Sequence, residues 1–450
     1  MQYKFSKYNI CFDSISGKKV IFNLHKRVPV ALSGESEWLI MQVNSGAMYI
    51  DVMGKVAEVL LAAGVIFPCE YDEESKIEEE RRKKMEADDV LEFTVLPTDA
   101  CNCDCIYCYQ HEPYHRMSKE VADNFIHMIK KNIHKYKKLV INWFGGEPLL
   151  EKKNIEYIMC EIDKVCKQAG VPYVGRMTTN GCLLDIDTFN IFLKYHILYY
   201  QITVDGTKEL HNKQRPLKNG KDAYGAIIQN LMEIKENVKS KAFEIMIRTN
   251  ISNELICNMK EIIDEFEVIF GEDKRFYWSW EPVQDWGGNK IEENRSAIMK
   301  TFEEYFDMMD YALQKKINLS VELIGNGEEW ICLACKKHGF VFNCNGEFQK
   351  CPMALYDKEQ YIREMNNIGY IEADGSIKLD YEKAKKWSGD YRKGKCIECK
   401  YYPLCNGVQC PYAVGFKGVT NCHAGKMNFF KILIEKQIEM KVKKGEGMVL

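Results

Sequence analysis

The segment TDACNCDCIYCYQ carries three cysteines, Cys101, Cys105 and Cys108, with the spacing C-x3-C-x2-C. Three thiolates on one short loop can hold three corners of a four-iron cluster and leave the fourth iron open to a ligand other than protein. A local zinc site is the alternative, because Cys103 adds a fourth thiol to the loop. The spacing favours the cluster, and the loop follows an apolar run from Leu91 to Leu96 that is typical of a strand.

The composition is that of a globular protein with room for two or three domains, at 450 residues and 46% hydrophobic content. A net charge of −3 gives no general attraction to nucleic acid. The sequence contains neither a secretory signal core nor a run of 18 apolar residues, so we expect no membrane partner. Nineteen cysteines without a signal peptide favour metal thiolates over a disulfide scaffold, which predicts a cytoplasmic location.

The chain separates into five expected segments. Residues 1–72 combine β-rich segments with two helical stretches, and residues 73–89 are typical of a charged connecting helix. In residues 90–320, strand-like and helix-like segments alternate six times, which predicts a parallel sheet with helical crossovers. Residues 321–425 are rich in cysteine, and residues 426–450 are typical of an amphipathic helix with a frayed tail.

The expected fold is therefore α/β, with a partial (β/α)6 TIM-like barrel between a small N-terminal α+β domain and a C-terminal Cys-rich Fe–S domain. In barrel folds the active site collects at the C-terminal ends of the strands, where the cysteine loop is expected. The helices expected in the barrel are Lys119–Tyr136, Asn154–Gln168, Asp187–Tyr195, Tyr224–Glu236, Glu254–Phe270 and Ala297–Leu313.

Polar motifs follow the next three expected strands. They are Gly145-Gly146-Glu147-Pro148, Thr179-Asn180-Gly181, and Asp205 with His211 and Arg215 downstream. Glycines let a ligand approach the backbone closely, and a carboxylate can pair with an ammonium group. A turn or a packing role would explain each motif alone, but their order along one barrel favours a shared site.

On these motifs the chain resembles the radical S-adenosylmethionine (SAM) superfamily. The resemblance implies that Cys101, Cys105 and Cys108 hold a [4Fe–4S] cluster whose open iron chelates SAM. It further implies that the GGEP motif binds the methionine amino group and that Arg215 meets the SAM carboxylate. The other cofactor contacts that the resemblance implies are Tyr107, near the adenine, Thr179, Asn180 and Asp205.

The C-terminal cysteines resemble the SPASM domain, which carries auxiliary four-iron clusters. The resemblance implies a proximal cluster on Cys332, Cys335, Cys351 and Cys410, and a distal cluster on Cys396, Cys399, Cys405 and Cys422. Cys344 is the rival of Cys332, and four residues precede Cys410 where the family has three. A pair of zinc sites is the alternative. The expected cofactors are thus three [4Fe–4S] clusters and SAM.

Radical SAM enzymes with a SPASM domain mostly modify peptides or proteins. The long segment before Leu91 favours the maturases of ribosomally made peptides, of the sactipeptide and ranthipeptide type. Their winged-helix-like N-terminal domain grips the leader of the precursor peptide through a strand edge. A structural cap on the barrel is the alternative role for residues 1–72.

We therefore expect a thioether-forming peptide maturase that uses flavodoxin or ferredoxin as electron donor. The alternatives are a carbon–carbon crosslinking maturase, an anaerobic sulfatase-maturating enzyme that oxidises Cys or Ser to formylglycine, and a non-catalytic Fe–S carrier. Asp285, which follows the sixth expected strand, is the candidate general base. Arg248 lies near the end of the fifth strand and has no assigned role.

Overall fold

The computed structural model describes residues 2–13, 17–110, 114–285, 288–299, 303–320, 331–389, 398–405, 410–418 and 447–450, with a few positions between 432 and 438. The chain divides into two compact units. The first comprises residues 1–86, 321–332 and 389–450, and the second comprises residues 87–320 and 333–388. This division differs from the expected segments, because residues 333–388 fold with the barrel rather than with the other C-terminal cysteines.

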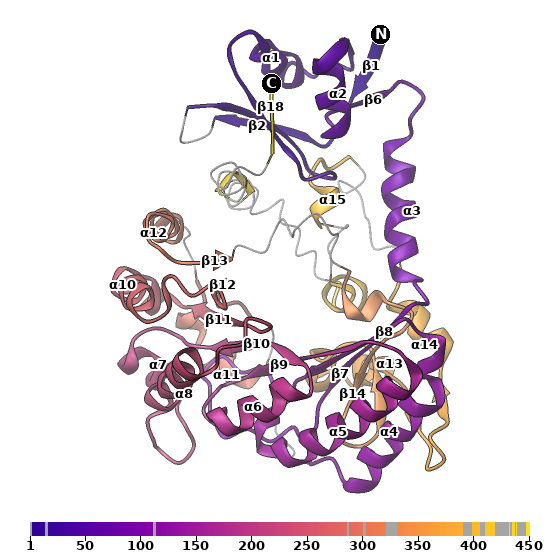
Figure 1. Ribbon diagram of the computed structural model, residues 1–450, viewed down its shortest axis with the longest axis vertical. Coiled ribbons are helices and arrows are strands. Elements are labelled where there is room, and N and C mark those ends of the chain that lie inside the picture. Colours follow the sequence, from indigo (N-terminus) through magenta and orange to yellow (C-terminus); the bar gives the residue numbers. More distant parts are fainter. Residues whose placement is uncertain are drawn as a thin grey trace. The chain divides into compact units, whose positions relative to one another are not determined.

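The second unit is built on one 11-stranded sheet with the order β13-β12-β11-β10-β9-β8-β7-β14-β15-β16-β17 (Figure 1). Its strands are β7 Val90–Val95, β8 Lys138–Trp143, β9 Tyr173–Thr179, β10 Ile197–Thr203, β11 Glu244–Ile251, β12 Phe276–Pro282, β13 Leu319–Ser320, β14 Gly339–Phe342, β15 Glu347–Gln349, β16 Asn367–Ile371 and β17 Ile377–Leu379. Strands β13 to β14 in this order pair in parallel, and β14 to β17 pair antiparallel.

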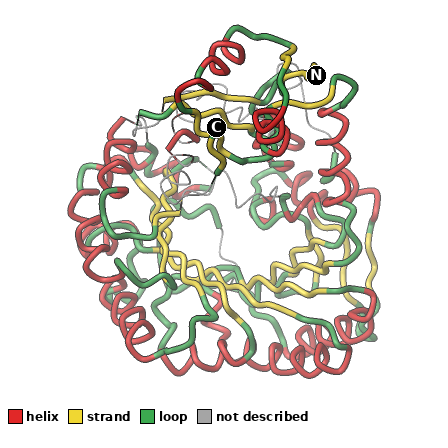
Figure 2. Tube along the Cα trace, turned by 45° about the horizontal axis from the view of Figure 1, so that its top comes forward, coloured by secondary structure: helices red, strands yellow, loops and turns green. Residues whose placement is uncertain are grey.

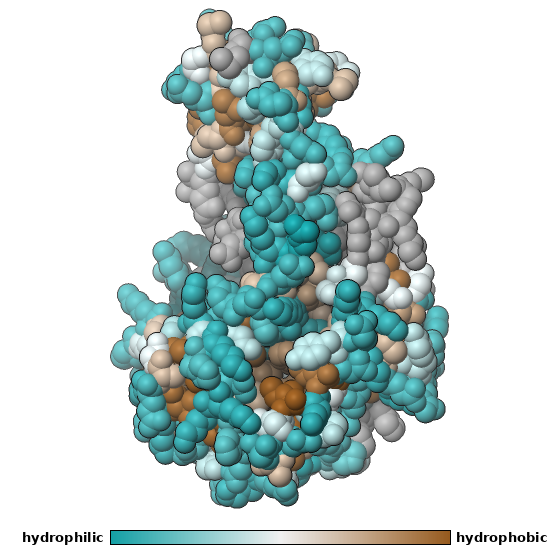
Figure 3. Space-filling model, turned by 90° about the vertical axis from the view of Figure 1, so that its right-hand side faces the viewer, coloured by the Kyte–Doolittle hydropathy of each residue, from teal (hydrophilic) through white to brown (hydrophobic). Residues whose placement is uncertain are grey.

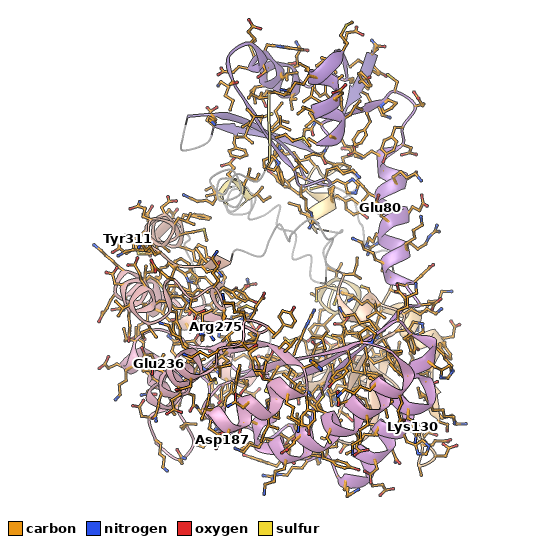
Figure 4. All side chains as sticks on the ribbon, in the orientation of Figure 1. Glu80, Lys130, Asp187, Glu236, Arg275 and Tyr311 are labelled. Atoms are coloured by element: carbon orange, nitrogen blue, oxygen red, sulfur yellow. The ribbon has the colours of Figure 1, made fainter. Side chains whose placement is uncertain are left out.

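The parallel part of the sheet curves into an open arc with helices along its outer side (Figure 2). These helices are α4 Lys119–Asn132, α5 Lys152–Ala169, α6 Ile186–Lys194, α7 Lys208–Gln214, α8 Ala223–Asn237, α9 Asn253–Ile256, α10 Met259–Phe270 and α12 Glu303–Leu313. The unit also contains the short helices α11 Asn289–Glu293, α13 Gln360–Asn366 and α14 Tyr381–Lys386. Lys130 on α4, Asp187 on α6 and Glu236 on α8 are exposed on the outer surface of this helical layer (Figure 4). The structure confirms the predicted α/β fold with a TIM-like partial barrel.

Strand β11 shows how the sheet separates its two faces. Ile245, Ile247 and Ile251 are buried, because alternate side chains point toward the helical layer. Arg248 and Asn250, on the opposite face, are only half-buried. The concave face of the arc is therefore polar at the carboxyl ends of its strands, as a site for a polar ligand requires.

The sheet extends beyond the six expected strands at both edges. Strand β13 pairs with β12, and β14 pairs in parallel with β7, the strand that precedes the cysteine loop. All four residues of β14 are buried. The carboxyl end of β14 therefore lies at the same sheet edge as the cysteine loop, which brings the 343–367 segment to the site.

The first unit contains two smaller sheets, with the orders β5-β1-β6 and β18-β4-β3-β2. Its elements are β1 Gln2–Phe5, β2 Asn9–Asp13, β3 Lys19–Asn23, β4 Pro29–Leu32, α1 Trp38–Asn44, β5 Tyr49–Asp51, α2 Gly54–Ala62, β6 Ile66–Pro68, α3 Glu73–Met85, α15 Tyr402–Cys405 and β18 Met448–Val449. Strands and helices thus combine here as the sequence predicts, while the winged-helix likeness stays a prediction.

Two more of the expected segments, residues 73–89 and residues 426–450, can be compared with the structure. Helix α3 has a hydrophilic exposed face (Figure 3), which agrees with the charged connecting helix. Met448 and Val449 pair in parallel with Val30 and Ala31 of β4, whereas a frayed tail was expected. Most of residues 426–446 lie outside the described part of the chain. None of the helices described has the length and hydrophobicity that a bilayer crossing requires.

Candidate active site

The cysteine loop starts at the carboxyl end of β7 and packs as one cluster. Cys103 and Cys105 are buried in it, and Cys101, Cys108 and Cys182 pack around them. The thiol of Cys103 hydrogen-bonds with those of Cys101, Cys105 and Cys182, and these bonds raise its pKa. The structure therefore brings the three predicted cluster ligands together, and it adds Cys103 and Cys182 as their thiol neighbours.

The thiols of this loop differ in acidity. A hydrogen bond from Cys103 lowers the pKa of Cys105 to about 7 against the effect of burial, and the charge of Arg215 acts in the same direction. Burial raises the pKa of Cys108 to about 12. Within the described residues no three Cys, His, Asp or Glu side chains form a ready metal site. Three cysteines on one loop are nevertheless a donor set that fits a cluster with one open iron.

The two glycines of the GGEP motif pack against the cysteine loop itself. A Cβ atom on Gly146 would lie 2.2 Å from the carbonyl oxygen of Ala100, and one on Gly145 would lie 2.3 Å from that of Thr98. Gly146 N also donates to Thr98 O at 3.2 Å, and Glu147 N donates to Ala100 O at 2.8 Å. The close approach that glycine permits is therefore made here by the backbone just before Cys101.

Glu147 ties the end of β8 to the end of β9. Its carboxylate is 1% exposed and accepts hydrogen bonds from Thr179 Oγ1 at 2.6 Å, Asn180 N at 2.7 Å and Leu149 N at 2.9 Å. Burial raises its pKa, and these bonds oppose the rise. Asn180 in turn donates to Asn102 in the cysteine loop at 2.7 Å. The GGEP and TNG motifs thus form one buried network that positions the loop.

A second network joins the ends of β10 and β11 to the loop. Asp205 is fully buried and accepts from Asn250 N at 2.7 Å and from the hydroxyl of Tyr107. The Tyr107 oxygen accepts from Arg215 Nη1 at 2.7 Å and from Asn250 Nδ2 at 3.0 Å. The Arg215 and Asp205 side chains are 4.0 Å apart. Three of these residues, Tyr107, Asp205 and Arg215, were predicted from the strand-end motifs or their neighbours, and Asn250 was missed.

Arg215 retains a hydrogen-bond donor for a ligand. It directly follows α7, the helix that carries His211 after β10. Its Nε atom is buried and has no hydrogen-bond partner among the described residues. His211 is fully buried and accepts from Asp205 N through Nδ1 at 3.0 Å. Burial and the charge of Arg215 lower its pKa to about 3, so it is neutral. A buried guanidinium with an open donor fits the carboxylate of SAM.

A cavity of about 1240 Å³ borders the cysteine loop in the second unit. Cys108 and Tyr109 line it on one side, and Cys344, Glu347 and Gln349 line it from β15 and the turn before it. Cys344 is 5% exposed, and burial raises the pKa of its thiol to about 12. Cys344, the rival of Cys332 in the sequence, therefore faces the same space as a predicted cluster ligand.

The other C-terminal cysteines divide between the two units. Cys335 and Cys351 are buried in the second unit. Cys332, Cys399 and Cys410 are half-buried in the first unit. Cys396, Cys422 and the side chain of Cys405 lie outside the described residues. The two auxiliary clusters stay a prediction.

Asp285 follows β12 at the carboxyl edge of the barrel, as expected. Its side chain is 42% exposed and lies 3.9 Å from Arg295. Asn250 and the pair Asp99 and His115 were not singled out from the sequence. Asn250 lies two residues after Arg248, which the sequence placed near the end of the fifth strand, so the rule that polar residues at strand ends form the site would have found it.

Comparisons with known proteins relate the barrel to a family. Residues 95–261 match the family described as the Radical SAM superfamily. The chain is 23% identical over 341 residues to the cysteine-type anaerobic sulfatase-maturating enzyme of Clostridium novyi (strain NT). That alignment covers 70% of this chain and 86% of the relative. It is 21% identical over 436 residues to the radical SAM cyclopropyl synthase TigE of Paramaledivibacter caminithermalis. That alignment covers 89% of this chain and 86% of the relative.

A solved structure shows a similar fold. The structure of anSMEcpe with bound AdoMet and the Cp18Cys peptide matches with a TM-score of 0.53 and 18% identity, over 71% of this chain and 88% of that one. The chain carries a radical SAM domain that is homologous to the anaerobic sulfatase-maturating enzymes. This family implies a [4Fe–4S] cluster and SAM.

Replacing Tyr107 by Phe tests the second network. The variant removes the hydroxyl that links Arg215, Asn250 and Asp205, so Asp205 loses a donor while buried. We expect the free energy of unfolding to fall by about 2 kcal/mol and SAM affinity to fall by about tenfold, measured by urea unfolding and by equilibrium dialysis. Tyr173→Phe is the control, because it removes a tyrosine–carboxylate bond to Asp163 on the outer face. Equal SAM affinity in the two variants contradicts the prediction.

Proposed function

We propose that this chain is a radical SAM peptide maturase that joins cysteine sulfur to carbon in a ribosomally made, Cys-rich peptide. The cavity beside the cysteine loop carries the proposal. At about 1240 Å³ it exceeds the roughly 300–1,000 Å³ of sites for drug-sized ligands, so a segment of several residues fits. Carboxylates, lysines, carboxamides and tyrosines line it, and these groups recognise a polar peptide chain.

The residues around the cavity support the chemistry that the family implies. When bound, the cluster and SAM supply a 5′-deoxyadenosyl radical that takes a hydrogen atom from the substrate. Cys101, Cys105 and Cys108 would hold the cluster, and Arg215 would orient the SAM carboxylate. Glu147, Thr179 and Asn180 are buried, so water is excluded from this part of the site. We extend the proposal to two auxiliary [4Fe–4S] clusters on the C-terminal cysteines and to a flavodoxin or ferredoxin as electron donor.

The first unit is proposed to bind the leader of the precursor peptide. Strand β5 is an edge strand of its sheet, and an edge strand offers free main-chain groups to an extended peptide. Large apolar side chains on α1 and around β5 are exposed. They are Trp38, Met41, Met48, Tyr49 and Met53. An apolar surface beside an open strand edge suits a leader peptide with hydrophobic anchors.

Formylglycine formation is the second candidate, because one relative is a cysteine-type anaerobic sulfatase-maturating enzyme. The extent of the alignments favours the first candidate. The alignment with the cyclopropyl synthase covers 89% of the 450 residues and so leaves roughly 50 residues of this chain unaligned. The segment before the barrel unit has 86 residues, so the unaligned residues are too few to include all of it. The similarity to the cyclopropyl synthase therefore includes part of the N-terminal segment. The sulfatase maturase aligns with 70% of the chain.

The proposal is tested with the full chain reconstituted under anaerobic conditions. Iron and sulfide are counted, and the reduced protein is incubated with SAM and a short Cys-rich precursor peptide. We expect about twelve irons per chain, four for each cluster, and a peptide that has lost two hydrogens, or about 2 mass units, per crosslink. A peptide without its leader should react far more slowly.

Other results would replace the proposal. An exchange of sulfur for oxygen in a sulfatase-derived peptide, with no change in the Cys-rich peptide, assigns formylglycine formation instead. No 5′-deoxyadenosine from the reduced, reconstituted protein removes the radical chemistry and leaves an Fe–S carrier.

A further inference from the structure

His115 and Asp99 form a carboxylate–imidazole pair at the base of the cysteine loop. His115 Nδ1 lies 3.0 Å from Asp99 Oδ2, and His115 N donates to Asp99 Oδ1 at 2.5 Å. A carboxylate oxygen only accepts, so Nδ1 carries a proton, and in the neutral imidazole the lone pair is therefore on Nε2. Asp99 is 7% exposed, whereas the imidazole is 53% exposed. The pair thus joins a buried orienting group to an accessible basic nitrogen.

Contacts other than the carboxylate–imidazole bond also close the base of the loop. Thr98 and Arg116 form an isolated β-bridge across the loop base, and Met117 N donates to Pro97 O at 2.8 Å. The carbonyl oxygen of His115 also accepts from Thr98 Oγ1 at 2.6 Å. Backbone and hydroxyl groups therefore fix the loop base, and the imidazole is available for another role.

The position of the pair points to that role. Asp99 and His115 line the cavity of about 1240 Å³ together with Cys108 and Cys344. A peptide that fills this cavity would border both the cluster loop and the imidazole. Among the described residues, Nε2 of His115 receives no hydrogen bond that would block it.

We propose that His115 is the general base that removes the thiol proton of the substrate cysteine, with Asp99 as the residue that positions its imidazole. This inference rests on the proposed function, since it names the proton acceptor for that reaction. The thiolate, not the thiol, is the reactive form of cysteine, and a positioned base supplies it at neutral pH. Carboxylate-held histidines perform this role on unrelated folds.

The proton completes the balance of the reaction. One S–H bond and one C–H bond of the peptide break, and one C–S bond forms. The C–H hydrogen leaves as an atom to the 5′-deoxyadenosyl radical, and the S–H proton passes to Nε2 of His115. One electron passes to a one-electron acceptor of the iron–sulfur class. The peptide therefore loses two hydrogens in all.

The experiment uses the reconstituted full chain and compares His115→Gln, Asp99→Asn and Asp285→Asn, with the exposed His134→Gln as a matched control. Four quantities are measured for each: iron per chain, peptide affinity by fluorescence anisotropy, peptide product per 5′-deoxyadenosine, and the dependence of that ratio on pH. The wild type must form product first. If the wild type forms no product, the result contradicts the proposed function, whereas a loss confined to His115→Gln concerns the role of His115.

For His115→Gln we expect iron content and peptide affinity within twofold of the wild type and a product ratio at pH 7 lower by about 100-fold or more. The ratio should recover toward pH 9, because a free thiol ionises near pH 8.5 without a base. Asp99→Asn should show a smaller loss with the same recovery, since an amide cannot hold the Nδ1–H tautomer. A wild-type ratio in His115→Gln, a loss that alkaline pH does not restore, or the alkaline recovery in Asp285→Asn alone would overturn the proposal.

Discussion

Replacing Cys101, Cys105 and Cys108 together by alanine is expected to remove about four irons per chain and to abolish 5′-deoxyadenosine formation. The three thiols lie in one cluster at the end of β7, so they form one donor set and are lost together. Iron and sulfide analysis, with product detection by chromatography, measures both effects. The folded chain should persist, because alanine keeps the backbone hydrogen bonds that join the loop to Glu147 and to residues 214–218.

Two further variants make this result specific. Replacing Cys69, Cys160 and Cys257 by alanine changes as many thiols at exposed or half-buried positions, and it should leave iron and activity unchanged. Cys103→Ala removes the thiol that hydrogen-bonds with those of Cys101 and Cys105. A four-thiol zinc site would need this thiol, whereas an iron site on three cysteines would not. Full iron content in the triple variant of the loop, or loss of one zinc in Cys103→Ala, contradicts the cluster assignment.

The sequence predicted the barrel well, because each strand and helix carries its own periodic signal. The predicted Asn154–Gln168 became α5, Lys152–Ala169, and Asp187–Tyr195 became α6, Ile186–Lys194. The prediction Glu254–Phe270 was wrong in one respect, because the helix breaks at Cys257 and Asn258 into α9 and α10. A break between two apolar turns leaves the spacing of hydrophobic residues nearly intact, so periodicity did not detect it.

Long-range pairing was beyond the reach of sequence patterns. Strand β14 reads as a short apolar run in a Cys-rich region, yet it pairs in parallel with β7, more than 240 residues earlier. That pairing brings Cys344 and residues 343–367 to the edge of the barrel. The same holds for Asp99 and His115, which are separated by the cysteine loop and meet only when its two ends close. Strand-end motifs, in contrast, predicted Glu147, Asp205 and Arg215 from local order alone.

Replacing Arg215 by Met is expected to lower the free energy of unfolding of the second unit by about 3–5 kcal/mol at neutral pH. The variant keeps the length of the side chain and removes the positive charge nearest to Asp205, whose side chain is fully buried. A buried carboxylate without its counter-charge costs more than the ion pair itself contributes. SAM cleavage should also be lost, because the open donor of the guanidinium is gone.

The deficit in the free energy of unfolding of Arg215→Met, relative to the wild type, should depend on pH in a defined direction. Burial raises the pKa of Asp205 even in the wild type, and Arg215 lowers it. Without Arg215 the folded-state pKa rises further above the unfolded value. The folded chain then holds a proton that the unfolded chain releases, so stability is lost as the pH rises through the folded pKa. The deficit relative to the wild type is therefore smallest in acid and largest at neutral pH.

The double variant Arg215→Met/Asp205→Asn separates the charge from the packing. Because asparagine carries no charge, the double variant should be more stable than Arg215→Met at pH 7.5, and its deficit should be nearly the same at pH 5 as at pH 7.5. Urea unfolding of the anaerobic protein at both pH values measures this. If Arg215→Met shows an equal deficit at both pH values, or if the double variant is no more stable, then the guanidinium stabilises the barrel by packing alone. Stability restored without SAM cleavage would show that Arg215 serves both the fold and the cofactor, since asparagine relieves the buried charge and leaves the cofactor carboxylate unpaired.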